Sequence, residues 1–162
     1  GVVVTAKVPF GFLELNDNCA AYGTIGHRHQ PEMAQELNFL SENKIKVLFT
    51  PHLVSMTRGI LGTNYATLKK EIKEKDLVDL YKEFYKNEPF IKIVDAPPAT
   101  KHTWGSNFVY LYPYVREDTN TLVVISALDN LVKGSAGAAI QNLNLMQGFE
   151  ETMGIGALPI YP

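Results

Sequence analysis

The chain has 162 residues, a length that suits one domain with a full hydrophobic core and no need for a disulfide or metal to hold it. Hydrophobic residues make up 46% and charged residues 20%, which argues against a largely disordered chain. The formal net charge of −2 gives no broad attraction for nucleic acid or an anionic membrane, so neither is expected as a partner. A single cysteine, Cys19, fits a reducing compartment, and we expect a cytoplasmic protein.

The first half of the chain is expected to contain short strands and one helix. β-Branched and apolar runs predict strands over residues 1–6, 19–22, 45–49 and 60–68. A helix is expected from Pro31 to about Leu40, because proline suits the first helical position. The start on a strand-like run without Met indicates a piece of a longer polypeptide or else a processed terminus. No run of about 18 apolar residues occurs, so no membrane span is expected.

The second half predicts a helix that Asp76 caps and that runs to about Lys86, with an apolar stripe on one face. Strands are expected over 90–94, 108–115 and 122–128, the last two joined in a hairpin by a turn at 117–120. A final helix is expected from near Ser135 to Met146, followed by a loop. These elements predict an α+β fold, a mixed and largely antiparallel sheet with helices on one face.

One candidate site lies in Gly26–Glu32, just before the first helix. His27 and His29 suit proton transfer, because imidazole titrates near neutral pH. Arg28 and the N–H groups at the helix start suit an anionic substrate group. The same residues also fit a polar loop whose histidines bond backbone or water. Metal binding is not expected, because no further acid or cysteine ligand stands at a suitable spacing.

Three further segments carry polar residues that suit binding. Arg58 suits a carboxylate or phosphate, and equally an ion pair at a surface or subunit contact. Lys101 and His102 lie on a predicted loop that fits an ordinary Gly/Pro connection as well. The glycine-rich run Asp129–Ala139 allows a close backbone or flat ligand, and fits close helix packing equally well. Cys19 lies in an apolar stretch where a free cysteine is usually an inert small hydrophobe.

These segments, in this order, resemble N-acetyl-γ-glutamyl-phosphate reductase, the NADPH-dependent family of arginine biosynthesis. The resemblance extends from residue 1 to about 154. The stretches that carry it are Ala21–Gly23, His27–Glu32, Phe49–Leu53, Met56–Leu61, Thr100–His102, Gly105–Asn107, Ser126–Ala127, Asp129–Gly134, Ala136–Gly137 and Gln141–Met146.

The resemblance implies a domain similar in fold to the C-terminal domains of glyceraldehyde-phosphate and aspartate-semialdehyde dehydrogenases. Residues 1–134 would form the catalytic and dimerisation domain, and 135–162 a helix and tail packed on an absent NADP-binding domain. In that family a cysteine thiolate attacks an acyl phosphate, and NADPH then reduces the thioester to the semialdehyde. A homo-oligomer, dimer or tetramer, is implied, with the aromatic face of 108–114 as a candidate interface.

The resemblance also implies roles for individual residues. His29, or else His27, would be the acid/base. Arg28, Glu32 and Arg58 are the candidates for contact with the acyl phosphate substrate. The residues expected near NADP, which the absent domain would mainly bind, are Asp129, Asn130, Lys133, Gly134 and Ala136.

Two departures from the family pattern matter. The dinucleotide domain and its Asn-Pro-Gly-Cys nucleophile segment have no counterpart, and Cys19 does not match that segment, so the chain alone is expected to be inactive. The family's Ser/Gly-rich loop after Lys7 is shortened or missing, since Val8–Gly11 follows at once. The alternatives are a non-enzymatic dimerisation or interaction module and a domain like that of aspartate-semialdehyde dehydrogenase.

Overall fold

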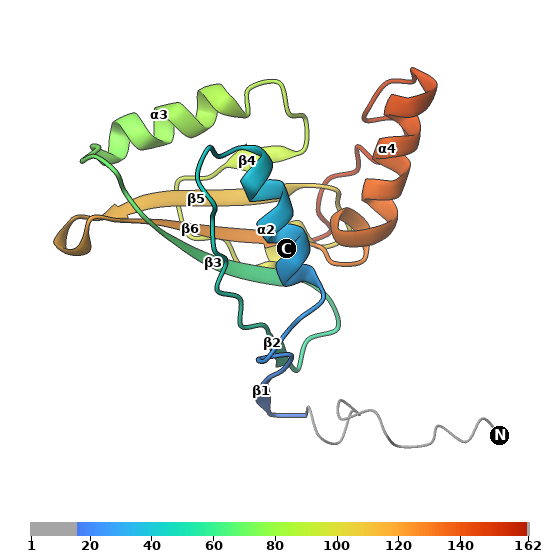
Figure 1. Ribbon diagram of the computed structural model, residues 1–162. Helices are drawn as coiled ribbons and strands as arrows, with labels where there is room; N and C mark the ends of the chain where they lie inside the picture. The colour runs from blue at the N-terminus through green and yellow to red at the C-terminus, as the bar shows by residue number, and fades with distance from the viewer. Residues whose placement is uncertain (1–15, 162) are drawn as a thin grey trace. The chain divides into compact units, whose positions relative to one another are not determined.

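The computed structural model describes residues 16–161 and divides the chain into two compact units, Gly1–Met56 and Thr57–Pro162 (Figure 1). Each unit is described separately below. The strand expected over residues 1–6 and the loop expected after Lys7 lie outside the described residues.

The first unit contains a two-stranded antiparallel ribbon and one helix. Strand β1 (Cys19–Ala21) pairs with β2 (His52–Val54), and helix α2 (His29–Phe39) lies between them in the sequence. Side chains alternate along such a ribbon, so Ala20 is half-buried while Cys19 is exposed. The expectation that Cys19 packs as a small hydrophobe is therefore wrong.

Two other expectations for this unit need correction. Helix α2 begins at His29, so Pro31 lies within the first turn, where its missing N–H still costs no helical hydrogen bond. Residues 45–49 do not form a strand, because their backbone bonds to side chains of α2. Asn38 exchanges two hydrogen bonds with the backbone of Ile45, and Gln30 donates to the Val47 carbonyl.

The second unit is built on a four-stranded sheet in the order β3-β6-β5-β4. Its strands are β3 (Ile60–Thr67), β4 (Ile91–Ile93), β5 (Val109–Arg116) and β6 (Thr121–Leu128). Only the β4–β5 pair is parallel. Helix α3 (Glu74–Phe84) packs against β5 and β4. The sheet confirms the expected α+β fold with its mixed, largely antiparallel strands.

Helix α3 starts three residues earlier than the sequence predicts. Lys73, in an extended conformation, occupies the N-cap position, so Asp76 does not cap the helix but lies in its first turn, where the helix dipole favours an acid. Leu77, one turn into the helix, is buried. Partial burial of Tyr81 on the next turn raises the pKa of its phenol. Leu80 and Phe84 stay exposed, so the sheet covers only part of the predicted apolar stripe.

The predicted hairpin is confirmed as the pair β5–β6, joined by the turn η2 (Glu117–Thr119) and by Asn120 in the left-handed region. Tyr112 and Tyr114 lie opposite Ile125 and Val123, and their rings are 5.5 Å apart. On β3, Tyr65 lies opposite Val123 and so shares the tyrosine face, where it is 72% exposed. That this face is a subunit interface stays a prediction.

Three loops meet at one end of this sheet, around the carboxylate of Asp129. Its side chain is fully buried. Oδ2 accepts a hydrogen bond from the Gly105 N–H at 2.7 Å, and Oδ1 accepts from the N–H groups of Leu131 and Val132 at 2.8 and 3.1 Å. Arg58 Nη1 lies 3.4 Å from Oδ2. Burial acts to raise the pKa of Asp129, but these N–H donors and Arg58 outweigh it and hold the pKa below its ordinary value.

The last helix, α4 (Gly137–Gln147), follows a single π-helical turn, η3 (Val132–Ala136). The expected start near Ser135 falls within that turn. Gly137 is buried, and a Cβ there would collide with Asn107 Oδ1 and lie 2.8 Å from the Val132 carbonyl oxygen. A glycine is therefore required at this position for close backbone packing.

The Gly137 contact can be tested by substitution with alanine. In an open helix this change stabilises by up to about 1 kcal/mol, but here overpacking should cost about 1–3 kcal/mol. Gly134→Ala is the matched control, because its new Cβ meets only ordinary contacts at 3.4 Å or more. Chemical denaturation of both variants measures the difference. A Gly137→Ala protein as stable as the Gly134→Ala protein would refute the close contact.

The Asp129 anchor predicts a specific loss of stability in acid. Because its folded pKa lies below the ordinary value near 3.9, its contribution is present above that value and is lost as pH falls through the folded pKa. Asp129→Asn should lower the free energy of unfolding at pH 7 by roughly 3 kcal/mol and flatten its fall between about pH 5 and 2. Asp118→Asn, which removes an exposed ion pair, should leave stability almost unchanged. Equal stability of both variants at pH 7 would contradict this role.

Candidate functional site

Two groups of candidate residues exist, one in each unit. The first begins with His27, which packs in a small aromatic cluster. Its ring centroid lies 5.2 Å from that of Tyr22, 4.8 Å from that of His29 and 5.4 Å from that of Phe49, all edge-on. Its Nδ1 accepts a hydrogen bond from the backbone N–H of His29 at 3.2 Å. In that bond Nδ1 is the acceptor, so the tautomer that fits it carries its hydrogen on Nε2.

His29 differs from His27 in its surroundings. It is the first residue of α2 and its side chain is exposed. Arg28, in the N-cap position, and Glu32, in the first turn, are exposed as well. The sequence therefore correctly placed these four residues together at the start of one helix. The accessible imidazole among them is that of His29, and the accessible cation is Arg28.

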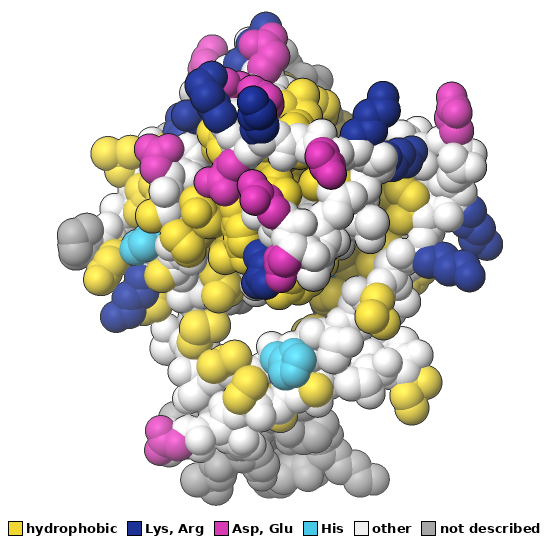
Figure 2. Space-filling view, turned by 90° about the vertical axis from the view of Figure 1, so that its left-hand side faces the viewer, with side chains coloured by type: hydrophobic (Ala, Val, Ile, Leu, Met, Phe, Trp, Pro, Cys, Tyr) yellow, Lys and Arg dark blue, Asp and Glu magenta, His cyan; other side chains and the backbone are white. Residues whose placement is uncertain are grey.

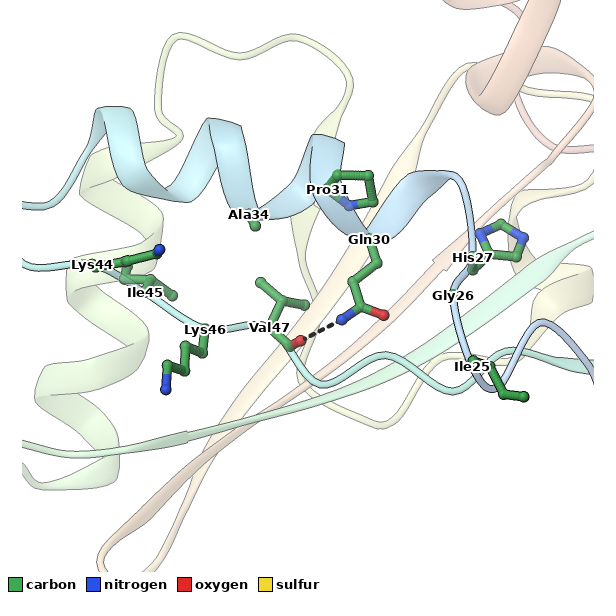
Figure 3. A pocket seen from close by; sticks show the side chains of 10 residues that line it. All are labelled: Ile25, Gly26, His27, Gln30, Pro31, Ala34, Lys44, Ile45, Lys46 and Val47. Atoms are coloured by element: carbon green, nitrogen blue, oxygen red, sulfur yellow. Dashed lines mark hydrogen bonds between the residues drawn. The ribbon is translucent and has the colours of Figure 1, made fainter.

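An open cavity of about 540 Å³ lies between α2 and the segment 44–47 (Figure 3). His27 lies at one end and Lys44 at the other, and the Gln30 amide crosses it to the carbonyl of Val47 (Figure 3). Its remaining lining is largely apolar, from Ile25, Pro31 and Ala34 among others. The cavity thus adjoins the histidine cluster and is formed where the sequence was expected to make a strand.

The second group is Arg58 with its neighbours at the end of the sheet. The Arg58 side chain is 29% exposed and forms an ion pair with Asp129. Asn130 Oδ1 accepts the Gly59 N–H at 2.6 Å. Asp129 and Asn130 therefore direct their side chains into the protein, toward the segment that carries Arg58.

Lys133 belongs to a separate polar network. Its Nζ donates to Gln141 Oε1 at 2.7 Å and lies 5.6 Å from the centre of the Phe90 ring. Gln141 in turn donates to Glu151 and accepts from Asn107. Burial lowers the pKa of Lys133, against the opposing charge of Glu151. Of the residues expected near a cofactor, Gly134 and Ala136 are the exposed ones.

Sequence reasoning did not find this network or the role of Asn144 beside it. Asn144 is 5% exposed and donates to the carbonyls of Glu151 and Met153, which ties the end of the chain to α4. The available signal was an asparagine inside an apolar helix, where its low propensity favours such a fixed partner. The expected packing of 135–162 on a further domain stays a prediction.

Lys101 and His102 lie in the short helix η1 (Thr100–Thr103) and contact the chain's own end. Lys101 Nζ lies 5.5 Å from the centre of the Trp104 ring and 5.4 Å from that of Tyr161, on which His102 stacks. Both residues are thus engaged in packing the tail against this loop.

Other kinds of site find no support in the part of the chain that the structure describes. Across residues 16–161 no three side chains of His, Cys, Asp or Glu gather as metal ligands. No helix in that range is long and apolar enough to span a bilayer. On the face shown in Figure 2, basic and acidic side chains are interspersed with apolar ones, so that face carries no field of a single sign.

Comparison with known proteins gives consistent results. Residues 4–130 match the family described as semialdehyde dehydrogenase, dimerisation domain. The N-acetyl-gamma-glutamyl-phosphate reductase of Thermoanaerobacter pseudethanolicus is 49% identical over 153 residues, covering 93% of this chain and 44% of the relative. That of Geobacter metallireducens is 50% identical over 160 residues, covering 97% and 46%. The chain thus spans a little under half the length of these curated relatives.

A solved structure supports the same fold. Aspartate semialdehyde dehydrogenase II from Vibrio cholerae superposes with a TM-score of 0.63 over 83% of this chain and 42% of that one, at 16% sequence identity. At that identity the likeness concerns the fold alone. The family match over residues 4–130, more than half of the chain, shows that the chain belongs to the semialdehyde dehydrogenase dimerisation-domain family.

Proposed function

We propose that this chain is the second domain of an NADP-dependent N-acetyl-γ-glutamyl-phosphate reductase. The observation that carries the proposal is the 49–50% identity to such reductases over almost the whole chain. The reaction converts an acyl phosphate, NADPH and a proton into the semialdehyde, NADP⁺ and phosphate. The description of the family as a dimerisation domain supports association of two copies.

The chain's own contribution is acid/base chemistry by His29. When bound, NADPH supplies the hydride, and a cysteine outside this chain carries the acyl group as a thioester. His29 accepts the proton of that thiol, which frees the sulfur to attack the acyl carbon. The imidazolium then gives this proton to the departing phosphate as the carbon–oxygen bond breaks. Exposure at the first turn of α2 supports this role, because a mobile proton carrier has to reach both groups.

His27 is then a positioning residue. Its Nδ1 holds the backbone N–H of His29, and its ring packs against that of His29. Both contacts limit the movement of the first residue of α2. Arg28 and Glu32, exposed on the same turn, are the proposed contacts to the anionic and polar parts of the substrate.

The residues expected near NADP fit such a group only in part. Gly134 and Ala136 are exposed and small, so a flat ring could approach their backbone closely. Asp129, Asn130 and Lys133 instead bond within the protein and would affect a cofactor through the loop that they hold. We therefore propose that NADP is bound mainly by another domain of the polypeptide.

The proposed function is tested with the full-length polypeptide that carries this chain. We expect it to oxidise NADPH with N-acetyl-γ-glutamyl phosphate and to turn over aspartyl phosphate far more slowly. The chain alone should show no turnover, because its one cysteine, Cys19, lies in β1 and does not match the family's nucleophile segment. Turnover by the isolated chain would contradict the proposal that the nucleophile and the main NADP site lie outside it. Equal rates with both acyl phosphates would contradict the substrate assignment.

Substitution of the two histidines separates their roles. In the full-length polypeptide, His29→Ala should lower kcat by about 10²–10⁴ and leave the KM for NADPH unchanged, because it removes only proton transfer. His27→Asn should stay within about tenfold of the wild type, because an asparagine oxygen can accept the N–H of His29 in place of Nδ1. Steady-state kinetics measure both. If His27→Asn loses as much kcat as His29→Ala, the acid/base is His27.

A further inference from the structure

Arg58 and Gly59 lie immediately before β3, and Asp129 and Asn130 lie immediately after β6. The register pairs Ile60 with Leu128, so the two dipeptides are neighbours at one end of the sheet. Their side chains and backbone interlock in two places: Asp129 with the Arg58 guanidinium, and Asn130 with the Gly59 N–H. Two consecutive residues of one loop thus hold two consecutive residues of the other.

The Gly59 end of this contact has little freedom. Gly59 has φ of +109°, and a Cβ there would lie 2.8 Å from Cβ of Thr100. Glycine alone adopts that backbone readily, which turns the chain sharply just after Arg58. The bond from its N–H to Asn130 Oδ1, 2.6 Å long, fixes the turn and hence the point from which the Arg58 side chain departs.

The Asp129 end supplies a fixed negative charge. Three backbone N–H groups hold the carboxylate, one from the loop of Gly105 and two from the loop of Asp129 itself, and they limit its rotation relative to Arg58. Only Arg58 Nη1 approaches it, at 3.4 Å, and the side chain keeps 29% of its surface exposed. Among the described residues no other group bonds to Arg58. The guanidinium is therefore anchored on one side and has further N–H donors available.

We propose that Asp129 and Asn130 are positioning residues that hold Arg58 ready to bind an oxyanion of the substrate. This inference rests on the proposed function. An arginine with a preset orientation loses less conformational entropy when its planar donors bind a carboxylate or phosphate. The substrate carries both kinds of oxyanion, and the experiment below distinguishes them.

The reverse reaction provides the test, because semialdehyde and inorganic phosphate are then separate substrates and NADP⁺ is the oxidant. In the full-length polypeptide, Asp129→Asn should raise one substrate's KM about tenfold or more, with kcat and the KM for NADP⁺ nearly unchanged. A raised KM for phosphate assigns Arg58 to the phosphoryl group, and a raised KM for the semialdehyde assigns it to the carboxylate. Asp118→Asn, which breaks an exposed Arg–Asp pair, is the matched control and should change neither.

A double-mutant cycle shows whether Asp129 acts through Arg58. Arg58→Ala alone should raise the same KM, and adding Asp129→Asn should raise it little further, because the two residues form one unit. Independent, multiplying effects of the two substitutions would overturn the inference. So would an Asp129→Asn enzyme whose KM values equal those of the wild type.

Asn130 keeps the inference testable if Asp129→Asn does not fold. Asn130→Ala should raise the same KM, and Asn130→Asp should restore it, because an aspartate oxygen can still accept the Gly59 N–H. An unchanged KM in Asn130→Ala would overturn the inference. If the wild-type polypeptide does not turn over the acyl phosphate, the proposed function and this inference both fail. If the wild type is active but the variants keep its KM values, the inference alone fails.

Discussion

The fold of the second unit depends on a single buried carboxylate. Asp129 stands at the end of β6, and its two oxygens collect the N–H groups of Gly105, Leu131 and Val132 together with the charge of Arg58. A dehydrated carboxylate is costly unless each oxygen is satisfied, so these partners are not interchangeable. The consequence is that the loops entering β3 and β5 and the turn leading to α4 adopt one arrangement relative to each other.

The elements that the sequence pattern predicted correctly are those whose conformation is determined mainly by neighbouring residues in the chain. The alternation of tyrosines in β5 and the polar turn at 117–120 indicate a hairpin without knowledge of any distant contact, and the structure confirms it. The same holds for β3 and for the existence of helix α3, although only part of its apolar stripe is covered. Boundaries were less accurate: α2 begins before Pro31 and α3 before Asp76, because caps depend on the preceding backbone as much as on the capping residue.

The parts that pattern did not predict are set by distant partners. The apolar run 45–49 has the composition of a strand, but Asn38 and Gln30 of α2 take its backbone groups. The sequence likewise did not predict that Asp129, Asn130 and Lys133 point into the protein. A polar glycine-rich loop has the same composition whether its side chains bind a ligand or other parts of the protein. Burial and hydrogen-bond partners, which require coordinates, decide between those two interpretations.

The geometry of the two histidines distinguishes between them, whereas their spacing in the sequence does not. Spacing alone treats His27 and His29 as equivalent, because either one stands beside the helix start. The structure makes them unequal: His27 uses Nδ1 to hold the backbone and packs edge-on against Tyr22 and Phe49, while His29 is exposed. A proton carrier must change protonation state during turnover, and protonation of Nδ1 in His27 would break the bond that fixes the start of α2. The same contact that makes His27 a good support therefore makes it a poor acid/base, which is why we propose His29 for that role.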